Sequence, residues 1–240
     1  MRDGATPGEG LASVITVDLA ETPLRQLNAR LHALAPDTNE THWRVLNPDG
    51  RHAIACGLQV PVEVEIDGHV GYYCAGMNKH ATVRINGNAG QGVAENMMSG
   101  LVVVAGNASQ SAGASGRGGL LVIEGDASSR CGISMKGIDI VVKGSVGHMS
   151  AFMAQAGTLV ICGDAGDALG DSLYEAKIFV KGRVASLGAD CVEKAMRPNH
   201  LARLARLLEA AGCDDDPASF RRYGSARRLY NFHVDHADQY

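Results

Sequence analysis

The fold is decided by residues 85–147, which read INGNAGQGVAENMMSGLVVVAGNASQSAGASGRGGLLVIEGDASSRCGISMKGIDIVVKGSVG. A glycine returns every 19 residues through this stretch and on both sides of it. The series comprises Gly68, Gly87, Gly106, Gly125, Gly144, Gly163 and Gly182. A fixed period of this length indicates a repeat architecture.

The residues around each glycine repeat as well. Positions four and two before it are aliphatic and the position two after it is Ala or Val, as Val83, Ile85 and Ala89 illustrate around Gly87. Apolar residues at alternate positions predict a half-buried strand in every repeat. We expect the glycine at a sharp turn, where it has a positive φ or lies very close to neighbouring backbone.

Nineteen residues are too few for a strand, a crossover helix and two loops. They suit one rung of a parallel β-helix, in which successive turns stack and small residues fill the interior. Leucine-rich repeats have a similar period, but their fixed leucines are absent. The sequence therefore predicts an all-β, single-stranded parallel β-helix of about seven rungs over residues 58–190.

The segments outside the repeat are expected to cover the open ends of the column. Residues 1–57 are predicted to form an N-terminal cap and arm, with a strand at 14–17 and a helix that starts near Pro23. Residues 191–240 are predicted to form a C-terminal helix, which Gly212 ends, and a basic and aromatic docking tail. Both predicted helices carry leucines at helical spacing.

Composition excludes several classes of protein. The chain has 240 residues, of which 45% are hydrophobic, 20% are charged and 30 are glycine, with a net charge of −4. Such a balance fits a globular protein and lacks the basic footprint of a nucleic-acid binder. The sequence shows neither an apolar run of membrane-spanning length nor a secretion signal. We expect a cytoplasmic protein that binds neither nucleic acid nor membrane.

The six cysteines form no CxxC pair and are widely spaced. This pattern predicts free thiols in a reducing compartment, with no metal site in the chain. Cys74 and Cys131 occupy equivalent repeat positions and are predicted to be small, inward-facing core residues.

Motifs for catalysis or cofactor binding are weak. The string GNAGQG at residues 87–92 resembles a phosphate cradle, but a strand rather than a helix follows it, which favours a turn of the repeat. The sequence contains no HExxH, GxSxG or P-loop motif. His148 follows a turn glycine, and His233 and His236 lack a third ligand nearby. No catalytic, cofactor-binding or metal-binding residue is predicted.

Two polar features remain. Asp67, Glu124 and Lys143 occupy the position before a repeat glycine and are predicted to form a solvated stripe. The tail mixes basic and aromatic residues, which suits RNA binding or, preferably in this acidic chain, docking to a protein or to the column end. The candidate docking residues are Arg221, Arg222, Tyr223, Arg227, Arg228 and Tyr230.

Residues 85–147 resemble the C-terminal GXGXG domain of the glutamate synthase large subunit. The motif glycines match at Gly87, Gly90, Gly106, Gly125, Gly144 and Gly163. The resemblance covers about residues 60–190 and implies a right-handed β-helix. The same domain is found in one of the subunits of formylmethanofuran dehydrogenases and of related formyltransferase/hydrolase complexes.

The segments RHAIACGL (51–58), HVGYYCAGMN (69–78) and SARRLYNFHVDHADQY (225–240) look most like the β-helix subunit of three-subunit N-methylglutamate synthases. Those enzymes convert methylamine and glutamate to N-methylglutamate and ammonia. The resemblance implies an amidotransferase-like partner and an FMN and iron–sulfur partner, with no cofactor in this chain.

That resemblance predicts a non-catalytic subunit that positions its partners. The alternatives are the β-helix subunit of another glutamate-synthase-like enzyme, the β-helix subunit of a formylmethanofuran-dehydrogenase-type complex, or an independent enzyme with a site on one face of the column.

Overall fold

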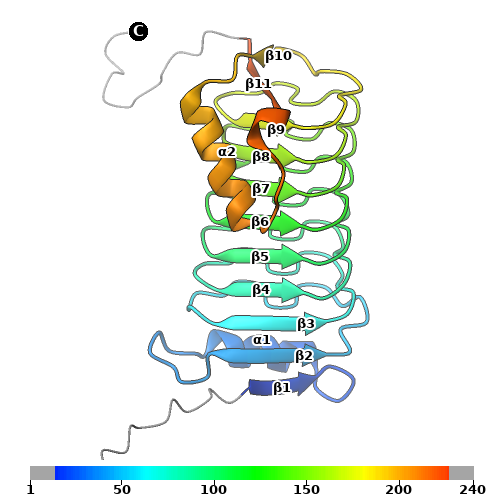
Figure 1. The fold of residues 1–240 in the computed structure, drawn as a ribbon. Helices are drawn as coiled ribbons and strands as arrows, with labels where there is room; N and C mark the ends of the chain where they lie inside the picture. Colours follow the sequence, from blue (N-terminus) through cyan, green and yellow to red (C-terminus); the bar gives the residue numbers. More distant parts are fainter. Residues whose placement is uncertain (1–13, 227–240) are drawn as a thin grey trace, which may run out of the picture.

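The computed structural model describes residues 14–226, which form a column of stacked strands (Figure 1). Its strands and helices, in chain order, are β1 (Val14–Asp18), α1 (Leu24–His32), β2 (His42–Leu46), β3 (Glu63–Asp67), β4 (Thr82–Ile85), β5 (Leu101–Val104), β6 (Leu120–Ile123), β7 (Lys136–Val142), β8 (Ala156–Ile161), β9 (Lys177–Val180), β10 (Cys191–Lys194), α2 (Pro198–Ala210), the short 3-10 helix η1 (Pro217–Ser219) and β11 (Arg221–Ser225).

Strands β1 to β9 pair in chain order, each parallel to the next. The register follows the sequence period, so that Thr82 lies beside Leu101 and Leu101 beside Leu120. The predicted parallel β-helix is therefore confirmed. The sheet starts at residue 14 rather than at residue 58, because β1 and β2 already belong to it.

The interior of the column is a stack of aliphatic side chains. The position four before each repeat glycine points inward and is fully buried, in Val64, Val83, Val102, Leu121, Ile140, Leu159 and Ile178. On a second wall, small residues from Val70 and Ala89 to Val184 form a run of isolated parallel bridges. Val, Leu, Ile and Ala side chains fill most of this interior, and Trp43 and Tyr223 are the aromatic residues that the described residues contribute to it.

Most repeat glycines are required because the neighbouring turn lies too close for a Cβ atom, and not because the backbone needs a positive φ. Among the seven, only Gly68 has a positive φ, of +137°. At Gly106, a Cβ atom would collide with the Asn88 Oδ1 atom and would lie 3.0 Å from the Gly87 carbonyl oxygen. The glycine is needed because each turn lies directly on the turn before it.

A polar ladder runs along the corner after these glycines. The Asn107 N–H donates to the Asn88 Oδ1 atom at 2.8 Å, and the Asp126 N–H donates to the Asn107 Oδ1 atom at 2.8 Å. The Ser145 and Asp164 N–H groups continue the pattern at 2.7 and 3.0 Å. Each side chain thus satisfies an amide of the next rung, which stabilises the corner.

Helix α1 covers the N-terminal end of the column, where it hydrogen-bonds to the turn segment that follows β2. The Asn28 Nδ2 atom donates to the Ala53 carbonyl at 2.8 Å, and the Asn28 Oδ1 atom accepts from the Ala55 N–H at 3.1 Å. One rung later the equivalent amide, that of Ala75, donates to the Ile54 carbonyl. The Asn28 side chain therefore replaces the backbone of a rung that is absent below.

The C-terminal segments do not close the column in the expected way. Helix α2 lies along the outer face of β6–β9 instead of across the end (Figure 1). Strand β11 returns between β9 and β10 and pairs antiparallel with both. Strands β10 and β11 therefore cover the last rung, which ends in β9. The reason lies in the outward residues of the sheet: a second apolar cluster joins Val122, Val141, Val160 and Phe179 to Leu204, Leu207, Leu208, Ala211 and Phe220.

Candidate functional site

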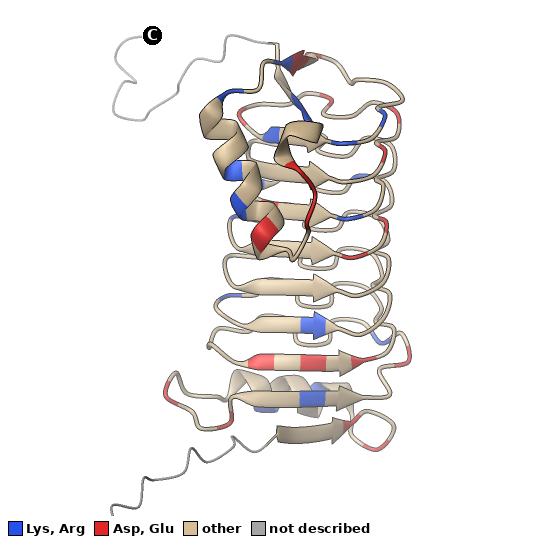
Figure 2. Ribbon diagram, viewed as in Figure 1, with Lys and Arg blue, Asp and Glu red and all other residues tan. Residues whose placement is uncertain are grey.

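The outer sheet face changes character along the column. Charged residues gather on β2, β3 and β4 (Figure 2), whereas β5, β6 and β8 carry none and β7 has Lys136 and Asp139. The central outward ladder, in register order, is Arg44, Glu65, Arg84, Val103, Val122, Val141, Val160 and Phe179. Only the apolar part of this ladder is covered by α2.

The charged part of this face is solvated and internally paired. The Arg44 Nε atom lies 2.6 Å from the Asp67 Oδ2 atom, and the Arg84 Nε atom lies 3.0 Å from the Glu63 Oε1 atom. Hydrogen bonds from Asn86 and from Arg44 lower the pKa of Asp67. Paired, exposed charges of this kind are suited to a polar protein interface rather than to acid–base catalysis.

A second exposed surface lies on the turn wall of the first rungs. Tyr72, Tyr73 and Met77 expose 49%, 43% and 53% of their area, and His52 stacks on Tyr72 with ring centroids 4.4 Å apart. We call these four residues the aromatic patch. Tyr and Met are enriched in protein–protein interfaces, so the patch is a candidate docking surface.

The predicted docking tail is only partly available. Tyr223 lies in β11 and is 2% exposed, so it packs in the core and does not project towards a partner. Arg221 is exposed, and the half-buried Arg222 donates from Nε to the Ala195 carbonyl at 3.1 Å. Arg227, Arg228, Tyr230, His233 and His236 lie outside the described residues.

The polar stripe before the repeat glycines is not a simple solvated face. In its upper part, the Lys143 Nζ atom lies 2.7 Å from the Glu124 Oε2 atom and donates to the Gly212 carbonyl at 3.1 Å. Further up the same stripe, the Lys181 Nζ atom donates to the Asp215 Oδ1 atom at 2.6 Å. The stripe thus holds the loop that follows α2 against the column.

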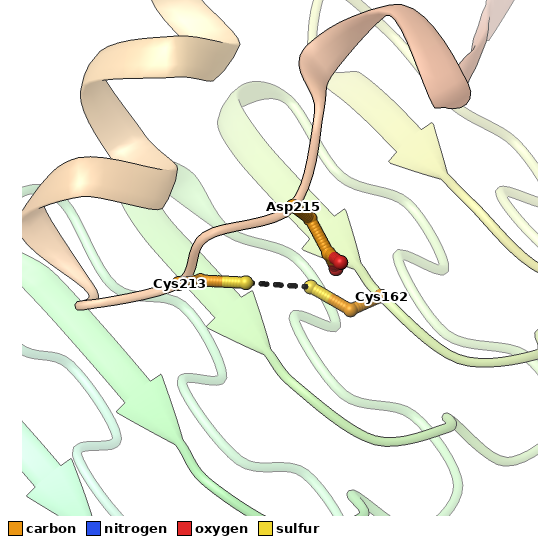
Figure 3. Close-up of side chains that lie close together, drawn as sticks. All are labelled: Cys162, Cys213 and Asp215. Carbon is orange, nitrogen blue, oxygen red and sulfur yellow. Dashed lines mark hydrogen bonds between the residues drawn. The ribbon is translucent and has the colours of Figure 1, made fainter.

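Two cysteines meet where this loop crosses the stripe. The Sγ atoms of Cys162 and Cys213 lie 3.8 Å apart, and the Asp215 carboxylate lies beside them (Figure 3). All three side chains are half-buried, and their ligand atoms lie within 4.8 Å of one another. Burial, together with Cys213 and Asp215, raises the pKa of Cys162, whereas the hydrogen bond from Lys181 lowers the pKa of Asp215.

This cluster is the part of the molecule that sequence reasoning missed. Cys162 and Cys213 are 51 residues apart and share no local motif. By contrast, Cys74 and Cys131 are fully buried, as predicted, and burial raises the pKa of Cys131 to about 12. His148 is exposed in its turn. Within residues 14–226, the Cys162, Cys213 and Asp215 cluster is the one group of three side chains with the spacing of metal ligands.

The described part of the chain, residues 14–226, has no helix with the length and apolar character to cross a membrane. No protein-family model matches the sequence, so the GXGXG resemblance stays a prediction. Protein GlxC from Rhizobium meliloti (strain 1021) is 65% identical over 225 residues, an alignment that spans 93% of this chain and 99% of the relative. At this identity and coverage, the chain belongs to the same family as protein GlxC.

Proposed function

We propose that this chain is a non-catalytic structural subunit of a glutamate-synthase-like N-methylglutamate synthase, in which it positions an amidotransferase-like subunit and an FMN and iron–sulfur subunit. The resemblance of residues 60–190 and of the flanking segments supports this assignment. The name of the related protein, GlxC, is compatible with one subunit of a larger set.

The observation that carries the proposal is the unbroken column between two different exposed surfaces. Parallel pairing from β1 to β9 and the polar corner ladder join every rung to the next. The aromatic patch on the turn wall and the charged outer face of β2–β4 lie on different sides of the same rungs. A rigid body with two such surfaces can hold two partners at a fixed distance, which raises the effective concentration of a transferred amine.

The test is purification of the tagged full chain from its native cells, followed by a visible spectrum and an assay with methylamine and glutamate. We expect two partner chains, a flavin and iron–sulfur spectrum, and N-methylglutamate as product. Flavin and partners without methylamine turnover would move the chain to another glutamate-synthase-like enzyme. Formyl-group chemistry in the purified complex would favour the formylmethanofuran-dehydrogenase alternative, and a colourless single chain would refute the proposal.

A surface variant locates the docking site. The double substitution Tyr72→Ser and Tyr73→Ser removes exposed aromatic area without touching the core, so we expect loss of one partner from the purified complex with an unchanged circular dichroism spectrum. The matched control is Tyr174→Ser, which removes a tyrosine of similar exposure (45%) several rungs away. Retention of both partners by the double variant would exclude the aromatic patch.

A further inference from the structure

We propose that Cys162, Cys213 and Asp215 form a binding site for a thiophilic divalent cation such as Zn²⁺, which fastens the loop after α2 to the column. The site is independent of the proposed function, because it lies on the outer side of β8 and not on the aromatic patch or the charged face. Two thiolates and one carboxylate are a donor set that suits Zn²⁺ better than Mg²⁺ or Ca²⁺.

The distances fit a tetrahedral site. Zinc–sulfur bonds of about 2.3 Å at a tetrahedral angle place two sulfur atoms about 3.8 Å apart. The Cys162 and Cys213 Sγ atoms are 3.8 Å apart, and the Asp215 carboxylate closes a triangle with them (Figure 3). Three protein ligands leave a fourth position for water, and half-burial of all three side chains leaves a path for the ion to enter.

The fold holds the three ligands in place without the ion. Cys162 directly follows β8, whose backbone is fixed by parallel pairing on both sides. Cys213 packs against the apolar cluster under α2, Asp215 accepts a hydrogen bond from the Lys181 Nζ atom, and the Lys143 hydrogen bond to the Gly212 carbonyl fixes the start of the loop. A preformed ligand set loses little conformational entropy when it binds an ion.

The charged groups around the three ligands are also compatible with a bound divalent cation. Two thiolates and a carboxylate around a divalent cation carry a net charge of −1, which the Lys181 ammonium group on Asp215 neutralises. A hydrogen-bonded carboxylate is typical of a ligand oriented by an outer partner. Binding replaces the two thiol protons, which are released to solvent, so the apparent affinity should rise with pH.

The site can be tested on the full chain, purified, reduced with a phosphine and freed of metal, by titration with Co²⁺. We expect one equivalent of Co²⁺ to produce a thiolate-to-cobalt charge-transfer band, which added Zn²⁺ abolishes. Cys162→Ala and Cys213→Ala should each remove the band and weaken binding at least a hundredfold. Lys181→Met should weaken it about tenfold.

The Cys162 substitution is chosen so that failure to fold cannot explain loss of the band. Ala105 occupies the position of Cys162 in a lower rung, so the column accepts alanine there. Cys56→Ala, which removes another half-buried cysteine, should leave the band unchanged. The proposal is overturned if the wild-type chain shows no thiolate band, if both alanine variants retain it, or if the chain contains a Cys162–Cys213 disulfide and binds no metal after reduction.

Discussion

The lower and upper halves of the column have the same inner architecture and opposite outer faces. In both halves the inward ladder is aliphatic and fully buried. At the central outward position, the lower half carries Glu65 and Arg84, whereas the upper half carries Val141 and Val160. The lower face is solvated, and the upper face is covered by α2.

The inward residues and the outward residues therefore have different roles. The inward residues and the glycines build the column, and they do so alike in each rung. The outward residues determine what the column binds: burying a valine stabilises the covering helix by roughly 1.5–3 kcal/mol, whereas a paired surface charge contributes about 1 kcal/mol or less. In the proposed complex, the open, charged half is the half available to partners.

The largest expected effect comes from the covered face. Phe179→Ala should lower the free energy of unfolding by about 3–5 kcal/mol, because Phe179 is fully buried between β9 and α2. Arg84→Ala, at the equivalent position of the open face, should change it by less than about 0.5 kcal/mol. Urea denaturation followed by circular dichroism measures both, and equal effects would contradict the distinction between the faces.

The repeat glycines should behave alike in both halves. Gly106→Ala and Gly144→Ala place a Cβ atom against the rung below, and each should cost about 1–3 kcal/mol. Gly212→Ala is the control, since its Cβ atom would meet nothing within 4 Å and only the positive φ of +60° opposes it, at about 1 kcal/mol. Thermal denaturation would refute uniform stacking if only one of the two rung variants were destabilised.

A smaller effect is expected where α2 is clamped by polar contacts. The Arg203 side chain donates to the Thr158 Oγ1 atom at 3.0 Å and to the Asp139 Oδ1 atom at 2.7 Å. Arg203→Ala should cost about 1 kcal/mol, because the Arg203 and Asp139 side chains are only partly buried. Arg206→Ala, an exposed position on the same helix, should be neutral in the same urea titration; a similar loss there would mean that Arg203 acts through helix propensity alone.

The smallest expected effect is a pH dependence of stability near neutrality that arises at His200, in the covered half. The buried His200 accepts the Arg197 N–H at its Nδ1 atom, at 3.2 Å. Burial, followed by the charges of Arg222, Lys177 and Arg197, lowers the pKa of His200. The unfolded chain therefore binds the proton first, and stability should fall as the pH drops from neutrality through about 6.5, the usual histidine value.

His200→Gln keeps a polar side chain but cannot titrate, so it should reduce the loss of stability between pH 7.5 and 5.5. The control His148→Gln, at an exposed turn, should keep the wild-type dependence. An identical pH dependence in His200→Gln and the wild type would show that His200 does not contribute.

Part of the covered face could have been predicted. The position three before each repeat glycine changes from Glu65 and Arg84 to an unbroken apolar series, a signal for an outward face that needs a cover. This signal is easily missed, because the aliphatic residues two and four positions before the glycine repeat in every rung and form a stronger pattern. The corner ladder has a similar signal, since Asn, Asp or Ser follows five of the seven glycines.

The cysteine cluster could not have been predicted from local sequence. Cys162 and Cys213 meet because α2 runs back down the outer face and its loop crosses the stripe at one particular row. A shift of this helix by one rung would place the loop beside Lys143 or Lys181 instead of Cys162.

The sequence by itself determined the column, because a 19-residue period with alternating aliphatic residues can bury its small side chains only by stacking each turn on the last. Only the tertiary structure decided which segment covers the apolar outer face, that Tyr223 enters the core, and which two thiols meet. These outcomes depend on where a single helix and a single returning strand pack. Such segments have no period, so their position follows from the shape and polarity of the surface that the finished column offers.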